Sequence, residues 1–262
     1  MPQRACERQP PHQAAQPLAM GNSYLLAYNA ALAAGWGYVL FLTYKTVLQE
    51  HGWTEEVFKA VEVPLKLSQT AALLEVVHAA TGLVKSPVGI TAMQVASRIW
   101  CLWGVVVPCA SAVLPRGLLS PGQQAALGLP GWANINFISL MTAWGCSEVI
   151  RYGFFALKEA LGRPPYFATW LRYTGFIVLY PLGVSSELTM AWLALPSIAQ
   201  RGLFSTSLPN AWNFGFSYYV ACILVMLTYI PGLPQLYGYM LTQRRKVLGG
   251  GGSAKAAKAK AA

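Results

Sequence analysis

Two side chains capable of acid–base chemistry lie seven residues apart in an apolar stretch of this chain: the phenol Tyr180 and the carboxylic acid Glu187. Seven residues make nearly two helical turns, so both side chains face the same side, about 10.5 Å apart along the helix axis. A kink at Pro181 or Gly183 would change that distance. A charged residue at the centre of a membrane helix costs about 2.5–3.5 kcal/mol and is usually functional. The pair therefore predicts an acid–base site in an apolar cleft.

Glu187 has no basic neighbour on its own helix, because the positions three and four residues away hold Gly183, Val184, Met190 and Ala191. Its carboxyl must find a partner on another helix or stay protonated. Either arrangement suits a group that gives or takes a proton near neutral pH.

Composition predicts an all-α membrane protein, built as a six-transmembrane-helix bundle. Of the 262 residues, 55% are hydrophobic and only 11% are charged, whereas a soluble helical domain of this length would need more charge. Six apolar segments are long enough to cross a hydrocarbon core of about 30 Å at about 1.5 Å per residue. They are residues 24–43, 67–84, 90–114, 134–157, 167–195 and 212–241.

We expect three regions along the chain. Residues 1–22, rich in Pro and Gln, read as a disordered cytosolic arm. Residues 23–247 form the six-helix membrane domain, and residues 248–262 a flexible basic cytosolic tail. Lys258 and Lys260 stand where the KxKxx retrieval signal of endoplasmic reticulum proteins has its lysines, although a plain linker explains them too.

The distribution of Lys and Arg predicts the orientation, because short cytoplasmic loops carry more of them. Both ends, the second loop and the fourth loop are basic, whereas the third and fifth loops hold Arg116 and Arg201. The first loop is an exception, with three lysines among four glutamates. An even number of spans with both termini cytosolic fits this pattern.

The spans hold further ionisable residues in a balanced set. Its members are the acids Glu75, Glu148 and Glu187 and the bases Arg98, Arg151 and Arg172. Balance predicts a polar interior in which these groups pair rather than face lipid. The alternative is that Glu148–Arg151 is an intrahelical ion pair and that Arg172 reaches to the membrane interface.

Several motifs resemble the very-long-chain 3-hydroxyacyl-CoA dehydratases, a family also called protein tyrosine phosphatase-like. They are residues 73–78 (LLEVVH), 94–98 (QVASR), 147–152 (SEVIRY), 171–173 (LRY), 179–188 (LYPLGVSSEL) and 229–232 (YIPG), within a resemblance that covers about residues 24–247.

The resemblance implies a six-span protein of the endoplasmic reticulum membrane that performs the third step of fatty acid elongation. Its catalytic pair matches Tyr180 and Glu187. Candidate substrate-binding or supporting residues are Arg98, Glu148, Arg151, Tyr152, Arg172, Gly183 and Ser186. The implied partners are 3-hydroxyacyl-CoA, the lipid bilayer, and the condensing enzyme, ketoacyl-CoA reductase and enoyl-CoA reductase of the elongase. The basic tail fits an anionic leaflet without invoking nucleic acid.

The phosphatase part of the family name fails a chemical test. The signature His-Cys-x-x-Gly-x-x-Arg needs a thiolate nucleophile and an arginine fork for phosphate. Residues 78–85 read HAATGLVK, so Ala79 replaces the nucleophile and Lys85 cannot provide the fork.

Dehydration needs one group to take the proton at C2 and another to protonate the hydroxyl that leaves C3. It needs neither a metal nor an organic cofactor, and the sequence suggests a site for neither. We assign Tyr180 to C2 and Glu187 to the C3 hydroxyl, with the reverse nearly as well supported. As a base, Tyr180 would need a positive neighbour.

Two rival functions fit a six-helix bundle with internal charges. A small multi-span lipid transporter is disfavoured because the chain shows no internal repeat and no matching pair of broken helices. A non-catalytic scaffold of the elongase complex is disfavoured because Tyr180 and Glu187 are intact.

Overall fold

The computed structural model describes residues 20–49, 54–128, 134–209, 211 and 213–259, with side chains from residue 23 to residue 249. The arm expected before residue 20 and the side chains of Lys258 and Lys260 lie outside this part of the chain. Within it, every named element is a helix, and the only strand-like pairing is an isolated bridge between Thr206 and Phe216. The predicted all-α class is therefore confirmed.

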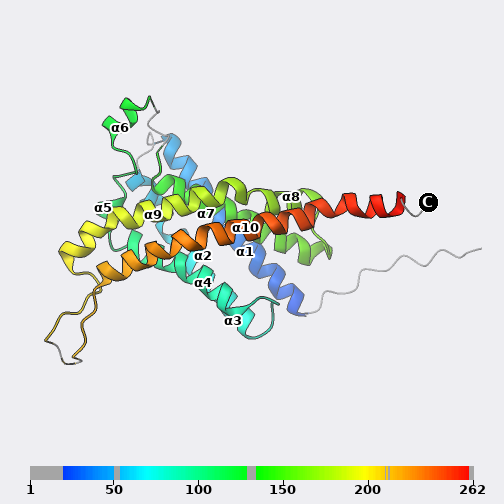
Figure 1. The fold of residues 1–262 in the computed structure, drawn as a ribbon, viewed down its shortest axis with the longest axis horizontal. Helices are drawn as coiled ribbons and strands as arrows, with labels where there is room; N and C mark the ends of the chain where they lie inside the picture. The colour runs from blue at the N-terminus through cyan, green and yellow to red at the C-terminus, as the bar shows by residue number, and fades with distance from the viewer. Residues whose placement is uncertain (1–19, 50–53, 129–133, 210, 212, 260–262) are drawn as a thin grey trace, which may run out of the picture.

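Four long helices run along the molecule (Figure 1): α1 Met20–Gln49, α7 Phe137–Leu161, α9 Phe176–Arg201 and α10 Tyr218–Ala259. Helix α7 packs between α1 and α9, and α10 packs on α9 and α8. The shorter elements are α2 Thr54–Ala71, α3 Leu73–Ala80, α4 Val88–Ile99, the π-helix η1 Trp100–Val106, α5 Ala110–Val113, α6 Pro121–Ala126 and α8 Tyr166–Thr174.

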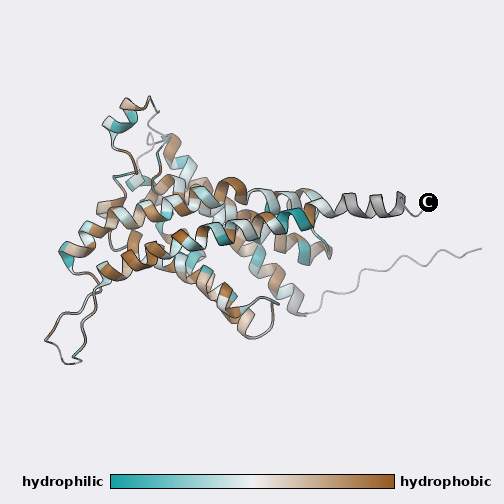
Figure 2. Cartoon of the chain, viewed as in Figure 1, coloured by the Kyte–Doolittle hydropathy of each residue, from teal (hydrophilic) through white to brown (hydrophobic). Residues whose placement is uncertain are grey.

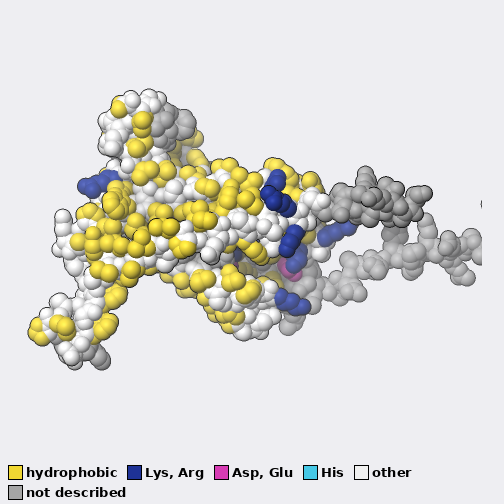
Figure 3. Space-filling model, in the orientation of Figure 1, with side chains coloured by type: hydrophobic (Ala, Val, Ile, Leu, Met, Phe, Trp, Pro, Cys, Tyr) yellow, Lys and Arg dark blue, Asp and Glu magenta, His cyan; other side chains and the backbone are white. Residues whose placement is uncertain are grey.

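Three helical segments in the described chain are long and apolar enough to cross a membrane: Ser23–Gln49, Phe176–Arg201 and Tyr218–Gly249. They correspond to the first, fifth and sixth predicted spans. The apolar surface of the long helices is visible in Figure 2, and Figure 3 shows hydrophobic side chains over much of the body. Exposed apolar area of this extent is typical of a surface that contacts lipid or protein.

The second and third predicted spans are wrong as continuous α-helices. Segment 67–84 breaks at Ala72, which separates α2 from α3. Segment 90–114 changes at Trp100 into the π-helix η1, where the N–H of Val107 donates to the carbonyl of Leu102 five residues earlier. Apolar composition signals burial but carries no information on such changes of helical pitch.

The fifth predicted span, residues 167–195, divides into α8 and α9 with their boundary at Gly175. The N–H of Gly175 donates to the carbonyl of Leu171 at 2.8 Å, so the chain stays helical across the boundary. The side chains of α8 and α9 are therefore spaced almost as in one helix.

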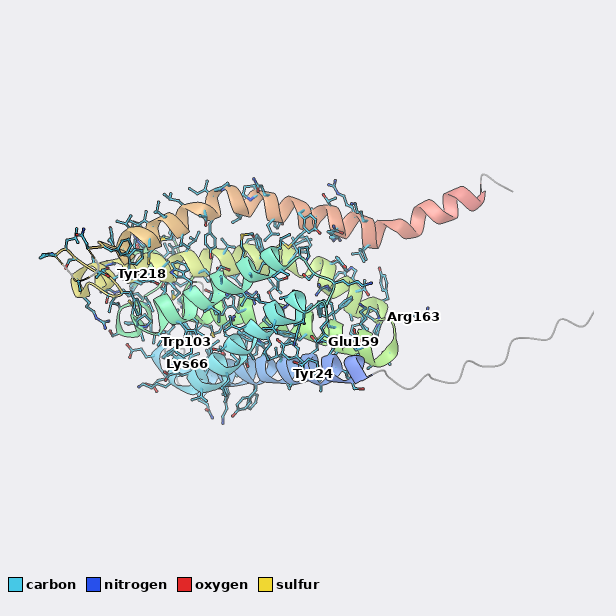
Figure 4. All side chains as sticks on the ribbon, turned by 90° about the horizontal axis from the view of Figure 1, so that it is seen from below. Tyr24, Lys66, Trp103, Glu159, Arg163 and Tyr218 are labelled. Carbon is cyan, nitrogen blue, oxygen red and sulfur yellow. The ribbon has the colours of Figure 1, made fainter. Side chains whose placement is uncertain are left out.

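The expected first loop, residues 44–66, is mostly helical. Its lysines and glutamates pair along an amphipathic α2, with Lys59–Glu56 at 2.7 Å and Lys66–Glu62 at 2.6 Å. Such pairs three or four residues apart stabilise a solvent-facing helix. Lys66 also lies over the ring of Trp103 in η1, 5.3 Å from its centroid (Figure 4).

Helix α10 continues to Ala259, past residue 247 where we place the end of the membrane domain. Its first turn is fixed by the hydroxyl of Tyr218, which donates to the carbonyl of Gly104 at 3.0 Å (Figure 4). The proposed division of the chain into an arm, a membrane domain and a tail stays a prediction.

Candidate active site

A cavity of about 610 Å³ opens between α4, α7, α8, α9 and α10. Eight of the nine candidate residues line it: Arg98, Glu148, Arg151, Tyr152, Arg172, Tyr180, Gly183 and Glu187. The ninth, Ser186, lies behind the cavity wall, where its hydroxyl contacts that of Ser139 at 2.8 Å and donates to the carbonyl of Leu182. Ser186 is therefore placed to join α9 to α7 rather than to touch a ligand.

Helix α9 carries both members of the predicted acid–base pair. It runs unbroken through Pro181, so Tyr180 and Glu187 stay on one side of the helix and face the same cavity. The spacing along the axis is then about 10.5 Å.

The carboxyl of Glu187 is buried and held by donors from two other helices. Its Oε1 accepts from the indole Nε1 of Trp144 on α7 at 2.7 Å. Its Oε2 accepts from the hydroxyl of Tyr229 on α10 at 2.8 Å. The expected partner on another helix is thus found twice, and both donors are uncharged.

Sequence reasoning did not include Trp144 and Tyr229 among the site residues. A signal for Trp144 was available, since it lies four residues before Glu148 and thus on the same face of α7. Tyr229 lies in the motif at residues 229–232, but nothing in the sequence links its phenol to a carboxylate on α9.

The hydroxyl of Tyr180 is less constrained than the carboxyl of Glu187. The Tyr180 ring stacks on Tyr237 of α10 with centroids 6.2 Å apart and planes inclined by 23°. Among the described residues, no hydrogen bond engages its phenolic oxygen. That oxygen is therefore available to a molecule in the cavity.

Beside the pair, four charged side chains and a tyrosine form an ion network that joins α3, α4 and α7. Arg151 donates to both oxygens of Glu75, at 2.5 and 2.8 Å, and through Nε to Glu148 at 2.9 Å. Arg98 pairs with the other oxygen of Glu148, and the hydroxyl of Tyr152 donates to Glu75. The predicted pairing of interior charges is confirmed for these residues, and Glu148–Arg151 is one part of a wider network.

The break at Ala72 has a consequence in this network. Helix α3 starts after it and carries Glu75 in its first turn, where the carboxylate meets Arg151 of α7. Two carboxylates and two guanidiniums balance, so the network has no net charge.

Substitution Arg151→Met should destabilise the folded protein, because it leaves the Glu75 carboxylate without a counter-ion, while Glu148 keeps only Arg98. Removing one partner of a fully buried ion pair costs about 3–5 kcal/mol, and this pair should cost less because its side chains are 30% and 18% exposed. We expect a clear fall in the thermal unfolding midpoint of the detergent-purified protein. Arg151→Lys should recover only part of it, because an ammonium cannot form the bidentate contact. A midpoint unchanged in Arg151→Met would contradict a stabilising network.

Arg172 stands apart from that network. Its guanidinium lies over the rings of Phe154 and Phe155, at 4.8 and 4.6 Å from their centroids. In the described part of the chain it contacts no carboxylate. Arg172 is therefore a cation on the cavity wall that has no carboxylate partner among the described residues.

Gly183 lies between the two members of the pair, where α9 approaches α7. A Cβ built on Gly183 would lie 3.6 Å from the Cβ of Ala143, which is ordinary contact. An alanine is thus tolerated there, whereas a larger side chain would enter the cavity between Tyr180 and Glu187.

The described residues contain no group of three His, Cys, Asp or Glu side chains placed to hold a metal ion. The chemistry that the cavity offers is proton transfer by a phenol and a carboxyl. Taken together, the molecule is an all-helical protein with membrane-length apolar helices around a buried acid–base cavity.

A family model described as "Protein tyrosine phosphatase-like protein, PTPLA" matches residues 69–250. The chain belongs to this family. The window at residues 78–85 nevertheless spans the end of α3 and the turn after it, with the His78 ring bonded to the hydroxyl of Tyr24 at 2.8 Å. It contains no cysteine.

Curated relatives are about 40% identical to this chain over the aligned residues. The very-long-chain (3R)-3-hydroxyacyl-CoA dehydratase hpo-8 of Caenorhabditis elegans is 41% identical, over 89% of this chain and 98% of its own. PASTICCINO 2 of Arabidopsis thaliana, with the same enzyme name, is 42% identical over 86% of this chain and 92% of its own. Very-long-chain (3R)-3-hydroxyacyl-CoA dehydratase 2 of Homo sapiens is 39% identical over 87% of this chain and 82% of its own. No solved structure matches.

Proposed function

We propose that this protein dehydrates very-long-chain 3-hydroxyacyl-CoA to trans-2-enoyl-CoA. One observation carries the proposal: a phenol and a buried carboxyl, Tyr180 and Glu187, face one cavity in a chain whose relatives are named for this reaction. The reaction corresponds to the third step of a fatty acid elongation cycle.

The contacts of Glu187 favour the carboxylate as the base. Both of its oxygens accept hydrogen bonds, and the indole of Trp144 can only donate, so the site fits an ionised acceptor. A carboxylate held in this way can take the proton from C2 of the substrate.

Tyr180 is then the acid. A tyrosine base needs a positive neighbour, and the described residues place none against its phenol. As an acid, its free hydroxyl gives its proton to the oxygen that leaves C3, and water forms. This assignment reverses the one that the sequence favours slightly, and it is proposed on the contacts of both groups.

Trp144 and Tyr229 act in this scheme as positioning residues that fix the Glu187 carboxyl. Tyr229→Phe removes one of two donors and Trp144→Phe removes the other, while both keep an aromatic ring. Each should lower kcat by about 10-fold with KM nearly unchanged, because a misaligned group loses transition-state interactions.

Kinetics of both variants and of Tyr237→Phe provide the check, since Tyr237 also lies on α10 but does not line the cavity. If the Tyr229 and Tyr237 variants have the same kcat, the positioning role of Tyr229 is rejected.

The membrane arrangement that we propose has six spans in the endoplasmic reticulum, with both termini cytosolic. Three of the spans have the length and apolarity described above. Helix α7, with 25 residues, reaches about 37 Å at about 1.5 Å per residue. Its charged residues Glu148 and Arg151 line the cavity, and Lys158 and Glu159 lie near its end. The remaining two spans would be α2–α3 and the run from α4 through α5.

The proposed partners are the other elongase enzymes: the condensing enzyme, the ketoacyl-CoA reductase and the enoyl-CoA reductase. A dehydratase consumes a 3-hydroxyacyl-CoA made by a reductase and yields an enoyl-CoA that a second reductase consumes. The chemistry of substrate and product supports these neighbours.

Purified protein tests the proposal against its rivals. In detergent, 3-hydroxyacyl-CoA should be converted to trans-2-enoyl-CoA, detected by chromatography. A lipid transporter would instead move the unchanged substrate into vesicles, and a scaffold would leave it unchanged and outside. Either of these results without enoyl-CoA would reject the proposed function.

A further inference from the structure

We propose that Arg172 and Arg244 form a phosphate-binding site at one end of the cavity, which holds the phosphates of the substrate's coenzyme A. This inference rests on the proposed function, because it names how the same cavity receives its substrate. The class of ligand is an organic diphosphate or phosphomonoester joined by a flexible arm to the reacting thioester.

The first argument is position along one helical run. Arg172 lies at the end of α8, eight residues before Tyr180, which corresponds to about 12 Å at about 1.5 Å per residue. Glu187 lies about 10.5 Å further along. A cation, a phenol and a carboxyl thus line the cavity in that order. A long substrate with an anionic head and a reacting centre deeper in the cavity fits this order.

The second argument is the meeting of α8 with α10. The Nε of Arg244 donates to the hydroxyl of Thr174, two residues after Arg172, at 3.4 Å. Gln243, its neighbour in the chain, lines the cavity. Arg244 therefore lies at the same end of the cavity as Arg172, on the opposite helix.

The third argument is unbalanced charge. Within the described residues neither arginine pairs with a carboxylate. The carboxylates Glu75 and Glu148 are already engaged by Arg98 and Arg151. Half-buried guanidiniums without a paired carboxylate, beside a low-dielectric cavity, attract and bind an anionic ligand.

The surface around this end of the cavity is also basic. Arg245 and Lys246 follow Arg244 on α10 and are exposed. Figure 3 shows Lys and Arg side chains gathered at the end of the body from which the last part of α10 extends. Arginine is well suited to phosphate because its planar fork can donate two parallel hydrogen bonds.

The test compares two substrates that share a reacting centre. One is 3-hydroxyacyl-CoA, and the other is the same acyl group on N-acetylcysteamine, a short thioester without phosphate. Arg172→Gln and Arg244→Gln should each raise KM for the CoA substrate about 10-fold and leave the kinetics with the short thioester unchanged. Free CoA should inhibit the wild type, and each variant should bind free CoA about 10-fold more weakly than the wild type does.

Arg163→Gln is the matched control. Arg163 lies at the same end of the molecule (Figure 4) but does not line this cavity, so its loss should leave KM for both substrates unchanged. Turnover of the short thioester shows in each variant that the catalytic groups are intact. If neither the CoA substrate nor the short thioester is turned over by any form of the protein, the proposed function itself fails.

Anionic lipid headgroups share the chemistry of a phosphate ligand, so a separate experiment must distinguish lipid binding from CoA binding. We expect the effect of Arg172→Gln on KM to be the same in detergent and in vesicles of phosphatidylcholine alone or with phosphatidylserine. An effect that appears only with phosphatidylserine would assign the arginines to lipid and overturn the proposal. An equal loss with CoA and short thioester would overturn it too.

Discussion

Glu187→Gln is expected to lower kcat by about 100-fold or more while the protein keeps its fold. General acid–base catalysis contributes about 10²–10⁴-fold, and an amide cannot take a proton from carbon. Glutamine keeps the volume of the side chain. Its carbonyl oxygen can still accept from Trp144, whose indole can only donate. Its amide can donate to the Tyr229 oxygen, which can also act as an acceptor.

Glu187→Ala separates chemistry from packing. It leaves the Trp144 and Tyr229 donors unpaired beside a cavity, at a cost of about 1–3 kcal/mol for each unsatisfied group. We expect alanine to lower both the rate and the unfolding midpoint, and glutamine to lower the rate alone. A glutamine variant with near-wild-type kcat at saturating substrate would reject a catalytic Glu187 and direct attention to Glu75 or Glu148.

Tyr180→Phe is expected to cause a loss of similar size, because only the phenolic oxygen is removed. The ring that stacks on Tyr237 remains, so the contact between α9 and α10 is kept. The measurement is kcat for enoyl-CoA formation together with the unfolding midpoint. Turnover close to that of the wild type would show that another group protonates the leaving hydroxyl.

Tyr237→Phe is the matched control for that variant. It removes a phenolic oxygen from the other member of the same stacked pair, on a residue that does not line the cavity. We expect kcat to stay within about 2-fold of the wild type, because surface or packing changes of this kind have small effects.

The sequence was informative where chemistry depends on spacing along one helix. Tyr180 and Glu187 share a face of α9, and Glu148, Arg151 and Tyr152 share the cavity face of α7, because helical periodicity alone brings them together. The all-helical class could be predicted from composition, because the chain is rich in hydrophobic residues and poor in charged ones. Ser186 was the exception, since its hydroxyl turns to Ser139 on α7 instead of into the cavity.

What joins different helices could not be predicted in the same way. Trp144 and Glu187 are 43 residues apart in the sequence, and Tyr229 and Glu187 are 42 residues apart. Glu75 and Arg151, which also make contact, are 76 residues apart. Their geometry depends on helix packing and on the break at Ala72, which apolar composition does not reveal. Periodicity thus indicated which groups face inward, and tertiary packing decided which of them meet.

The most direct test of the proposed catalytic pair uses a substrate deuterated at C2, given to wild-type protein and to the double variant Tyr180→Phe/Glu187→Gln. The wild type should form trans-2-enoyl-CoA and release one C2 deuteron to solvent per molecule of product, as followed by mass spectrometry. In the double variant, the rates of enoyl-CoA formation and of deuteron release should fall together. The fall should be about as large as in either single variant, because the effects of residues that act as a unit are not additive. Equal rates of enoyl-CoA formation in the wild type and the double variant would contradict the assignment of dehydration to Tyr180 and Glu187.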